Sequence, residues 1–436
     1  MAAFLCALAE ARKYGYNASF RFSIRAKQIE KTQGVSWMDG HGDSIGDSDI
    51  RRQANLGPPI EGAERAACLH ALIALQFIDG IGNRRLALLD SSSPLAWLDQ
   101  PSNRQHFCYR LSDEPKRKLL AFLRAPQASL EWEAANRVLS WLGEHGAGIS
   151  LKTDRDFPAR LLEIPDCPAF LYWAGCKSAL DKPLLSIVGT RKPTYVSARF
   201  ASDLATELAS LGFSVVSGMA SGIDTRAHRG ALAAGGQTVA VWATGLDKPY
   251  PARNNDLAAE IVKRGCVLTE MPLSTPPLAG YFPRRNRIVS GLSEGVIVVE
   301  AGEKSGSMIT ARLAMEQNRE VFAVPGAVNN PQAKGCHQLL REGACLTANI
   351  DDVLDNLSGF VSRALIAQQK ESRAEETTQP LPPELANVYA LLSEMMEPFE
   401  LILSRAKIPS AQLSSALVDL ELMGMIAADA GCYAKK

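Results

Sequence analysis

The sequence predicts an α/β protein built around a doubly wound, mostly parallel sheet. Between residues 184 and 357, short apolar runs rich in Val and Ile alternate with amphipathic segments of helical periodicity. Most of the runs are apolar throughout rather than alternately apolar and polar, as expected for strands that are covered on both faces. The intervening segments, most of them about ten to eighteen residues long, suffice for the crossover helices that join parallel strands.

Length and composition limit the classes of protein that fit. The 436 residues suffice for several domains of about 150 residues each. Lys plus Arg and Asp plus Glu both total 47, so the formal net charge is zero and any nucleic-acid binding must use local basic patches. The nine cysteines show neither a Cys-x-x-Cys pair nor a Cys/His zinc spacing, which indicates free thiols in a reducing cytoplasm and no metal site. No apolar run reaches the length of about 18 residues that a membrane span needs, so we expect a cytoplasmic protein without membrane insertion.

The N-terminal part divides into two regions. Residues 1–60 are too polar and glycine-rich, above all over residues 39–49, to build a core, and we expect a poorly ordered extension. Residues 61–150 show helical periodicity in their leucines and predict a helical domain of the SAM or helix-hairpin-helix type. The turn over residues 79–83 reads Asp-Gly-Ile-Gly-Asn, like a helix-hairpin-helix turn whose amides approach a phosphate. An ordinary helix–helix turn also fits, and we favour it slightly.

The predicted sheet lies in a central domain over residues 151–360. Its strands are expected at Leu184–Val188, Phe213–Ser217, Thr238–Ala243, Cys266–Glu270, Gly295–Glu300, Glu320–Val324 and Ala344–Thr347. Ligands of open α/β sheets bind where the parallel strands end, so the loops that follow these strands form the candidate binding site.

Five of these loops carry Gly, Ser or Arg at the same predicted edge of the sheet, which indicates a phosphate-rich ligand. Glycines let the backbone approach a ligand closely, successive free amides form anion nests, and arginine forks match phosphate oxygens. The candidate binding residues are Gly189, Thr190, Arg191, Ser217, Gly218, Ser221, Gly222, Lys248, Arg253, Asn254, Phe282, Arg284, Arg285, Asn286, Arg287, Ser305, Gly306 and Ser307.

The densest basic cluster in this set is Arg284-Arg285-Asn286-Arg287, which we place in a loop leading into a helix. A helix start offers unpaired N–H groups and a partial positive charge. Three guanidinium groups beside it would make a cradle for phosphate or carboxylate. The alternative interpretation is a solvated basic turn.

Catalytic patterns are weak. Asp224 and His228 are four residues apart and would share a helix face as an acid/base pair, but a capping Asp and a hydrogen-bonded core His are the favoured interpretation. Glu270 and Glu300 end predicted strands, where they would be catalytic or would orient arginines. The loop from Gly302 lacks the Gly-Lys-Ser/Thr ending of a Walker A motif. We therefore predict no catalytic residue, no cofactor and no metal.

The C-terminal part begins after a linker predicted over residues 361–382. Helical segments at 384–396, 399–406 and 411–425, followed by a hairpin over 426–434 that turns at Gly431, suggest a winged-helix-like domain over residues 383–436. Four cations and seven anions from residue 381 to the end give this domain a formal charge of −3. Because phosphate neutralisation dominates affinity for duplex DNA, such a domain is better suited to protein contact.

Several motifs together resemble the DNA-processing protein DprA family, also called Smf. The resemblance extends over residues 64–436 and is most specific over residues 184–350. Its motifs are Ile187-Val-Gly-Thr-Arg, Ser217-Gly-Met-Ala-Ser-Gly-Ile-Asp-Thr-Arg-Ala-His, Gly245-Leu-Asp, Tyr250-Pro, Phe282-Pro-Arg-Arg-Asn-Arg-Ile, Ser305-Gly-Ser-Met-Ile-Thr-Ala and Gly335-Cys-His-Gln-Leu-Leu-Arg-Glu-Gly-Ala.

The resemblance implies an extended Rossmann-like domain that binds single-stranded DNA with little sequence preference. It also implies a bacterial cytosolic protein that helps load the RecA recombinase during natural transformation, forms a homodimer through the Rossmann-like domain and is not an enzyme. By this match Arg191 and the segment 248–254 meet the DNA backbone. Some family members have Lys directly after the Tyr-Pro pair, whereas this chain has Ala252 followed by Arg253.

Two alternative functions would require motifs of their own. A nucleotide or nucleoside-phosphate hydrolase on a related Rossmann-like fold would carry a Pro-Gly-Gly-x-Gly-Thr-x-x-Glu loop, which the sequence lacks. A dinucleotide-dependent oxidoreductase would carry Gly-x-Gly-x-x-Gly after the first strand of the sheet, which is also missing.

Overall fold

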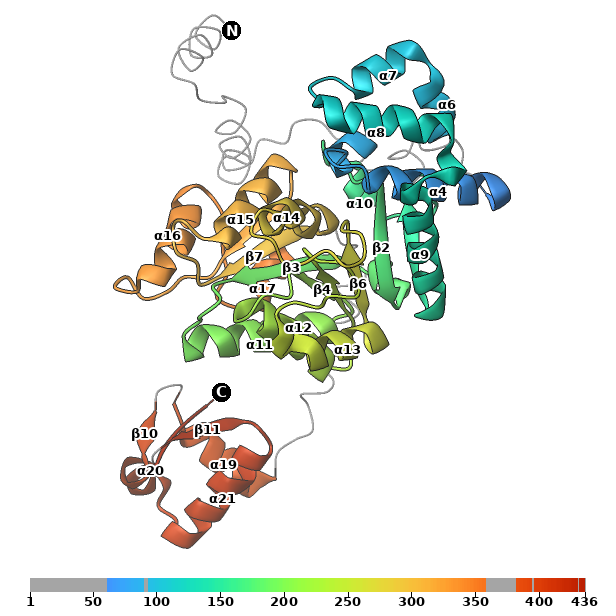
Figure 1. Cartoon of the computed structure of the whole chain (residues 1–436). Helices are drawn as coiled ribbons and strands as arrows, with labels where there is room; N and C mark the ends of the chain where they lie inside the picture. The colour runs from blue at the N-terminus through green and yellow to red at the C-terminus, as the bar shows by residue number, and fades with distance from the viewer. Residues whose placement is uncertain (1–60, 90–92, 358–381, 394–395, 430, 436) are drawn as a thin grey trace, which may run out of the picture. The chain divides into compact units, whose positions relative to one another are not determined.

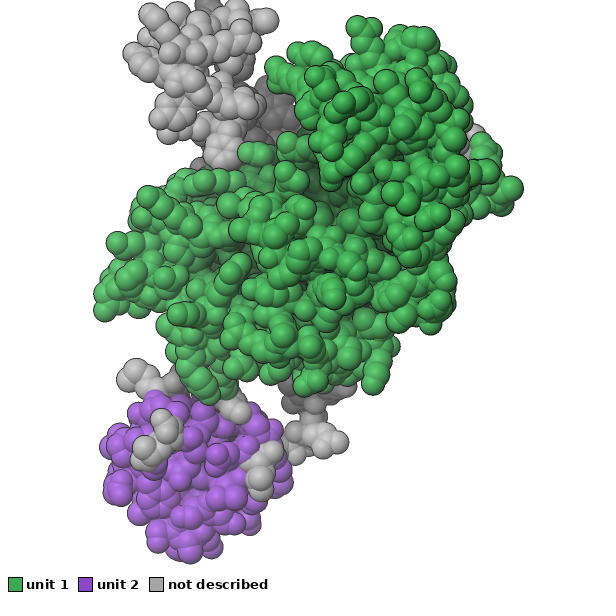
Figure 2. Space-filling model, viewed as in Figure 1, with its two compact units in different colours: residues 1–363 green, residues 364–436 purple. Residues whose placement is uncertain are grey.

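The structure is a computed structural model that describes residues 61–89, 93–357, 382–393, 396–429 and 431–435 (Figure 1). It divides into two compact units, residues 1–363 and residues 364–436 (Figure 2). The extension predicted over residues 1–60 lies outside the described residues, and so does all but the last residue of the linker predicted over residues 361–382.

The first unit is built on a nine-stranded sheet with the order β1-β2-β6-β5-β4-β3-β7-β8-β9. Seven neighbouring strands are parallel: β3 (Leu184–Gly189), β4 (Ser214–Ser217), β5 (Thr238–Val241), β6 (Cys266–Thr269), β7 (Gly295–Val299), β8 (Glu320–Ala323) and β9 (Cys345–Leu346). The ends of each strand lie within two residues of the predicted ends. Strands β4, β5, β6 and β7 are buried along their whole length. The predicted mostly parallel sheet is therefore confirmed.

Two antiparallel strands that the sequence patterns do not predict extend the sheet beyond β6. Strand β1 (Ala147–Leu151) pairs with β2 (Phe170–Gly175), and β2 pairs with β6. The helical periodicity predicts a helical domain up to residue 150, but helix α9 (Leu130–Glu144) ends before strand β1 begins. The pairing is tight at Gly148, because a Cβ atom there would lie 2.6 Å from the Trp173 ring.

Helices cover both faces of the sheet, as a doubly wound fold requires. Figure 1 shows α11 (Tyr195–Ser210), α12 (Ile223–Ala233) and α13 (Asn255–Arg264) on one face, with α14 (Tyr281–Leu292) and α15 (Gly306–Glu316) on the other. Helices α16 (Lys334–Arg341) and α17 (Ile350–Asn356) flank β8 and β9. In the parallel part, α11 to α15 each follow one strand in turn, so their N-termini gather at the edge where those strands end.

A helical region precedes the sheet and packs against it. It contains α4 (Gly62–Gln76), α5 (Asn83–Leu86), α6 (Pro94–Asp99), α7 (Pro101–Phe107), α8 (Asp113–Arg124) and α9. Its apolar core is continuous with residues of the sheet and its helices, among them Trp242 and Ile261. The side chains of Gln76 and Asn83 donate to the carbonyl of Glu270, at 2.8 and 3.2 Å. The turn between α4 and α5 therefore lies beside the end of β6.

The second unit has the predicted winged-helix architecture. Helices α19 (Pro383–Leu391), α20 (Phe399–Ala406) and α21 (Ser410–Leu422) pack on a sheet with the order β10-β12-β11. The hairpin is formed by β11 (Ile426–Asp429) and β12 (Cys432–Lys435), and Gly431 has a φ of 81° at its turn, as predicted. The short strand β10 (Glu397–Pro398) lies where no element was expected. Among the described residues no helix is long and apolar enough to cross a membrane.

Candidate nucleic-acid interface

The loops singled out from the sequence do meet at one edge of the sheet. The loops that follow β3, β4, β5, β6 and β7 lie at the carboxyl ends of parallel strands. Each leads into a helix, so five helix N-termini with partial positive charge face this edge. The arrangement is the one in which open α/β sheets bind ligands.

Glycines let these loops contact one another. A Cβ atom on Gly189 would lie 2.0 Å from the carbonyl oxygen of Val299. Gly222 has a φ of 81°, which side chains disfavour, and a Cβ there would lie 2.4 Å from the carbonyl oxygen of Thr190. The close approach expected from the sequence is therefore made by neighbouring loops of the protein, and both glycines position the edge.

The expected anion nest after β4 is filled by the chain itself. Asp224 accepts hydrogen bonds from the backbone amides of Gly218 and Ala220, at 3.1 and 3.2 Å. Ser217 is fully buried and donates to the carbonyl of Ile187 at 2.6 Å. Burial raises the pKa of Asp224, although Arg285 and the two amides oppose that change. Ser217 and Gly218 are thus corrected from ligand contacts to supports of the loop.

The arginine cluster is also corrected, because residues 284–287 lie inside helix α14 rather than in a loop. Arg285 is 6% exposed and donates through Nη1 to the carbonyl oxygens of Gly218 and Val241. Burial lowers its pKa to about 10, Asp224 opposes that change, and Arg191 adds to it. The buried Arg285 side chain therefore links the ends of β4 and β5 through hydrogen bonds.

Arg287 has two carboxylate partners within the protein. Its Nη2 lies 2.6 Å from Glu270 Oε1, and its Nε lies 2.9 Å from Asp166 Oδ2. The side chains of Arg287 and Glu270 are 8% and 3% exposed, so this is a buried ion pair. Burial alone would lower the pKa of Arg287, but the two carboxylates raise it. Arg287 is removed from the candidate binding residues, and Glu270 orients a guanidinium group, one of the two roles considered for it.

The exposed centre of the edge is a cluster of Arg191, Phe282 and Tyr250, called here the Arg191 cluster. The guanidinium carbon of Arg191 lies 5.7 Å from the centroid of the Phe282 ring, within cation–π range. The rings of Phe282 and Tyr250 are 5.7 Å apart. Arg191 and Tyr250 are exposed and Phe282 is half-buried. Tyr250 is not among the candidate binding residues, although it lies in the segment 248–254 that the family resemblance places at the DNA backbone.

Other exposed groups lie on the loops and helix starts at the same edge of the sheet. Lys248, Arg253 and Arg284 are exposed, and Arg253 donates to the hydroxyl of Ser221. Gly306 is exposed at the start of α15. The edge therefore presents several cations around paired aromatic rings, although the whole chain carries no net charge.

The remaining predicted residues hold the loops in place. Asn254 is buried and donates to the carbonyl of Met219 at 3.1 Å. Ser307 donates to Gly189 at 2.8 Å, and Asn286 donates to the carbonyl of Gly306 at 3.2 Å. Ser305 caps the N-terminus of α15, because its hydroxyl accepts from the amide of Met308 at 3.4 Å. The amide of Thr190 donates to the carbonyl of Glu300 at 2.8 Å.

Asp224 and His228 do not form an acid/base pair. His228 is fully buried, and its Nδ1 lies 2.7 Å from the hydroxyl of Thr238. Because that hydroxyl donates to the carbonyl of Val215 at 2.5 Å, His228 must donate to it from Nδ1. Burial lowers the pKa of His228 to about 3, so the ring is neutral. The favoured interpretation, a hydrogen-bonded core histidine, is confirmed.

Glu300 positions the loop that carries Arg191. Its Oε2 accepts from the amide and hydroxyl of Thr194 at 2.8 and 2.9 Å, and its Oε1 accepts from Asn330 at 3.1 Å. Burial opposes ionisation, but hydrogen bonds from Ser197, Thr194 and Asn330 outweigh it and lower the pKa of Glu300. Among the described residues no group of His, Cys, Asp and Glu is arranged to hold a metal ion.

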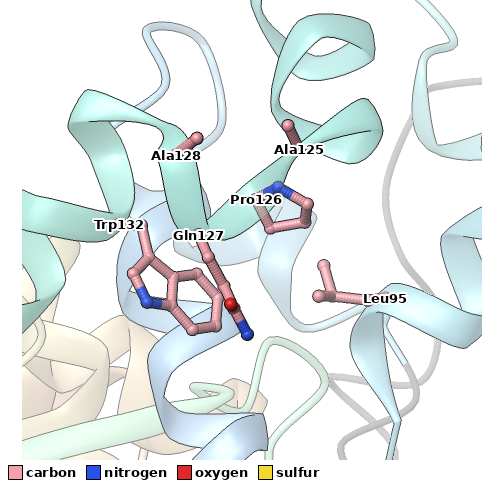
Figure 3. A pocket seen from close by; sticks show the side chains of 6 residues that line it. All are labelled: Leu95, Ala125, Pro126, Gln127, Ala128 and Trp132. Carbon is pink, nitrogen blue, oxygen red and sulfur yellow. The ribbon is translucent and has the colours of Figure 1, made fainter.

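A hollow of about 360 Å³ lies away from this edge, in the helical region (Figure 3). Figure 3 shows Trp132, Pro126 and Leu95 around it, and the polar side-chain atoms of the lining belong to Gln127 and to the indole nitrogen of Trp132. A lining without a charged group does not suit phosphate. The sheet edge, with its exposed cations and rings, is the better candidate for a phosphate-bearing ligand.

Comparison with known proteins identifies the family of both parts of the chain. Residues 148–358 match the family described as "DNA recombination-mediator protein A", and residues 372–431 match the family described as "DprA winged helix domain". "Protein Smf" of Escherichia coli (strain K12) is 37% identical over 323 residues, which cover 73% of this chain and 84% of that protein. The chain belongs to the DprA/Smf family. "DNA processing protein DprA" of Bacillus subtilis (strain 168) is 42% identical over 51% of this chain and 75% of its own length.

Solved structures of the DprA/Smf family are similar as well. The X-ray structure of DprA from Streptococcus pneumoniae is 30% identical, with a TM-score of 0.49, and the match covers 72% of this chain and 98% of that one. A Helicobacter pylori structure of DNA processing protein A, described by its "unique single-stranded DNA binding mode", is 35% identical, with a TM-score of 0.45. That match covers 48% of this chain and 95% of the other.

Proposed function

We propose that the protein binds single-stranded DNA, without strong sequence preference, at the carboxyl edge of its sheet. The observation that carries the proposal is the Arg191 cluster, in which two aromatic rings and a guanidinium group meet at an exposed surface. Bases stack on aromatic rings whatever their identity, and cations beside the rings neutralise the backbone. Membership of a family of recombination mediators supports the same conclusion.

The strand would be held mainly through its backbone and its base faces. Lys248, Arg253 and Arg284 supply exposed cations around the rings. Contacts to phosphates do not depend on sequence, and base faces carry little sequence information. A strand bound in this way is free to be passed on unaltered, and we propose that it is passed to the RecA recombinase by a homodimer of this protein.

The alternative function, hydrolysis of a nucleotide or nucleoside phosphate, gains no support from the site. Asp224, Glu270 and Glu300 are each engaged by hydrogen-bond donors of the chain, and His228 is buried and neutral. Each of these groups has a structural task, so none is left at the edge to act as an acid, base or nucleophile.

Competition between ligands separates the two functions. A labelled oligothymidylate should bind to the purified protein, and an excess of AMP or NAD should not displace it. No hydrolysis of AMP, NAD, ATP or DNA is expected, with or without Mg²⁺. Displacement by AMP together with release of a free base would instead establish a hydrolase.

Removal of residues 381–436 should leave most of the single-strand affinity intact. Residues 381–436 carry a formal charge of −3, and the Arg191 cluster lies wholly in the first unit, residues 1–363. We expect a change smaller than about tenfold, or about 1.4 kcal/mol, in an anisotropy titration. A larger loss would place part of the DNA site on the winged helix.

A further inference from the structure

An exposed aromatic residue follows the loop that carries Arg191. Tyr195, the first residue of α11, is 80% exposed, and Val196 after it is 74% exposed. A single exposed apolar residue is ordinary on a protein surface. The surroundings of Tyr195 set it apart, because Arg191 and Lys192 precede it on the same loop and both are exposed.

This loop is fixed at both ends. At its start, the amide of Thr190 donates to the carbonyl of Glu300 at 2.8 Å, and the carbonyl of Thr190 accepts from Ile223 at 3.2 Å. At its end, Thr194 donates twice to the carboxylate of Glu300 and accepts from the amide of Ser197 at 3.3 Å. Tyr195 is therefore held on a rigid support, so ordering a bound base against it costs little entropy.

The charge beside the ring favours a polyanion. Lys192 is exposed, and among the described residues no carboxylate is seen paired with it or with Arg191. Four residues of extended chain reach at most about 14 Å, so Tyr195 lies within a few nucleotides of Arg191. Lys192 lies between Arg191 and Tyr195 in the chain, so it is an exposed cation available to the backbone of a strand that reaches both.

We propose that Tyr195 is a second base-stacking platform for single-stranded DNA and that Lys192 contacts the phosphate backbone between the two platforms. This inference rests on the proposed function and extends the binding surface from the Arg191 cluster along the loop to the start of α11. A second copy of the chain is the competing occupant for the exposed Tyr195 and Val196.

Substrates with and without bases test the two roles separately. With an oligothymidylate of about twenty nucleotides, Tyr195→Ala should weaken binding about five- to tenfold, the lower part of the range for one stacked base, and Tyr195→Phe should retain wild-type affinity. With an abasic oligomer of the same length, Tyr195→Ala should bind like the wild type. Lys192→Ala should weaken both ligands equally and reduce the salt slope by about 0.7, whereas Tyr195→Ala should leave that slope unchanged.

Tyr109 provides a matched control, because it is 66% exposed but lies in the helical region between α7 and α8. Tyr109→Ala should bind both ligands like the wild type. Unchanged melting temperatures would show that the exposed substitutions leave the fold intact.

Photocrosslinking supplies an independent readout. Oligothymidylate carrying 5-iododeoxyuridine should crosslink to Tyr195 as well as to the Arg191 cluster, and mass spectrometry of the tryptic peptides would show both sites.

Wild-type affinity of Tyr195→Ala, with crosslinks only at the Arg191 cluster, would overturn the inference and leave the proposed function standing. A Tyr195→Ala protein that dissociates into monomers but binds DNA normally would assign this surface to a second copy. Absence of wild-type binding to either oligomer would instead refute the proposed function.

Discussion

Replacing Arg287 with alanine is expected to destabilise the sheet unit by about 3–5 kcal/mol, the cost of leaving a buried charge without its partner. The substitution leaves Glu270, whose side chain is 3% exposed, without its ion-pair partner. It also removes one partner of Asp166. Urea unfolding of the protein should show the loss in the transition of the first unit. The transition of the winged-helix unit should stay where it is.

Arg284→Ala is the matched control, since Arg284 lies in the same helix but is exposed. A change within about 0.5 kcal/mol is expected there. The double variant Arg287→Met with Glu270→Gln should lose less than the sum of its single changes, because it removes both charges of the pair. A stable Arg287→Ala protein with weakened DNA binding would contradict the structural role and restore Arg287 to the binding surface.

Binding should depend most on the Arg191 cluster. Arg191→Ala and Phe282→Ala are each expected to weaken binding of single-stranded DNA by about 1–3 kcal/mol, the range for a charge-assisted hydrogen bond or one stacked base. Their effects should not be additive, because the guanidinium group lies over the ring that the second change removes. Anisotropy titrations of the single and double variants measure this coupling.

Arg124→Ala serves as the control for charge, because Arg124 is exposed at the end of α8 in the helical region. It should bind DNA like the wild type. If Arg191→Ala and Phe282→Ala also bound like the wild type, with unchanged melting temperatures, the cluster would be an ordinary solvated surface.

The sheet could be predicted because each strand is marked by the residues of its own segment. Strands β4, β5, β6 and β7 are short and mostly apolar because both faces of each strand are buried. The topological rule for open sheets predicts that the candidate binding loops lie at one edge, and in the structure they do. Strand β1 carries no such signal, because Gly148 and Ser150 interrupt its apolar run. Strand β2 is an apolar, aromatic run, but it precedes the region in which strands and helices alternate and was not predicted.

The roles of individual arginines could not be predicted in the same way. Arg284, Arg285 and Arg287 are indistinguishable in sequence, yet only Arg284 is exposed. Their fates depend on partners far along the chain: Gly218 and Val241 for Arg285, and Asp166 for Arg287. The helical period separates them, since neighbouring positions point to different sides of α14. The contact that fills the predicted nest is local by comparison, because Asp224 lies only six and four residues from the amides of Gly218 and Ala220.

The central claim is that this edge of the sheet binds single strands through cations and base faces. The most direct test is the affinity for a single-stranded oligonucleotide and for the blunt duplex of the same sequence, measured over a series of salt concentrations. We expect the single strand to bind more tightly, its affinity to fall with a logarithmic slope of about −0.7 for each phosphate contacted, and Arg191→Ala to reduce that slope by about 0.7. Equal affinity for the duplex, or an affinity that salt does not change, would contradict the claim.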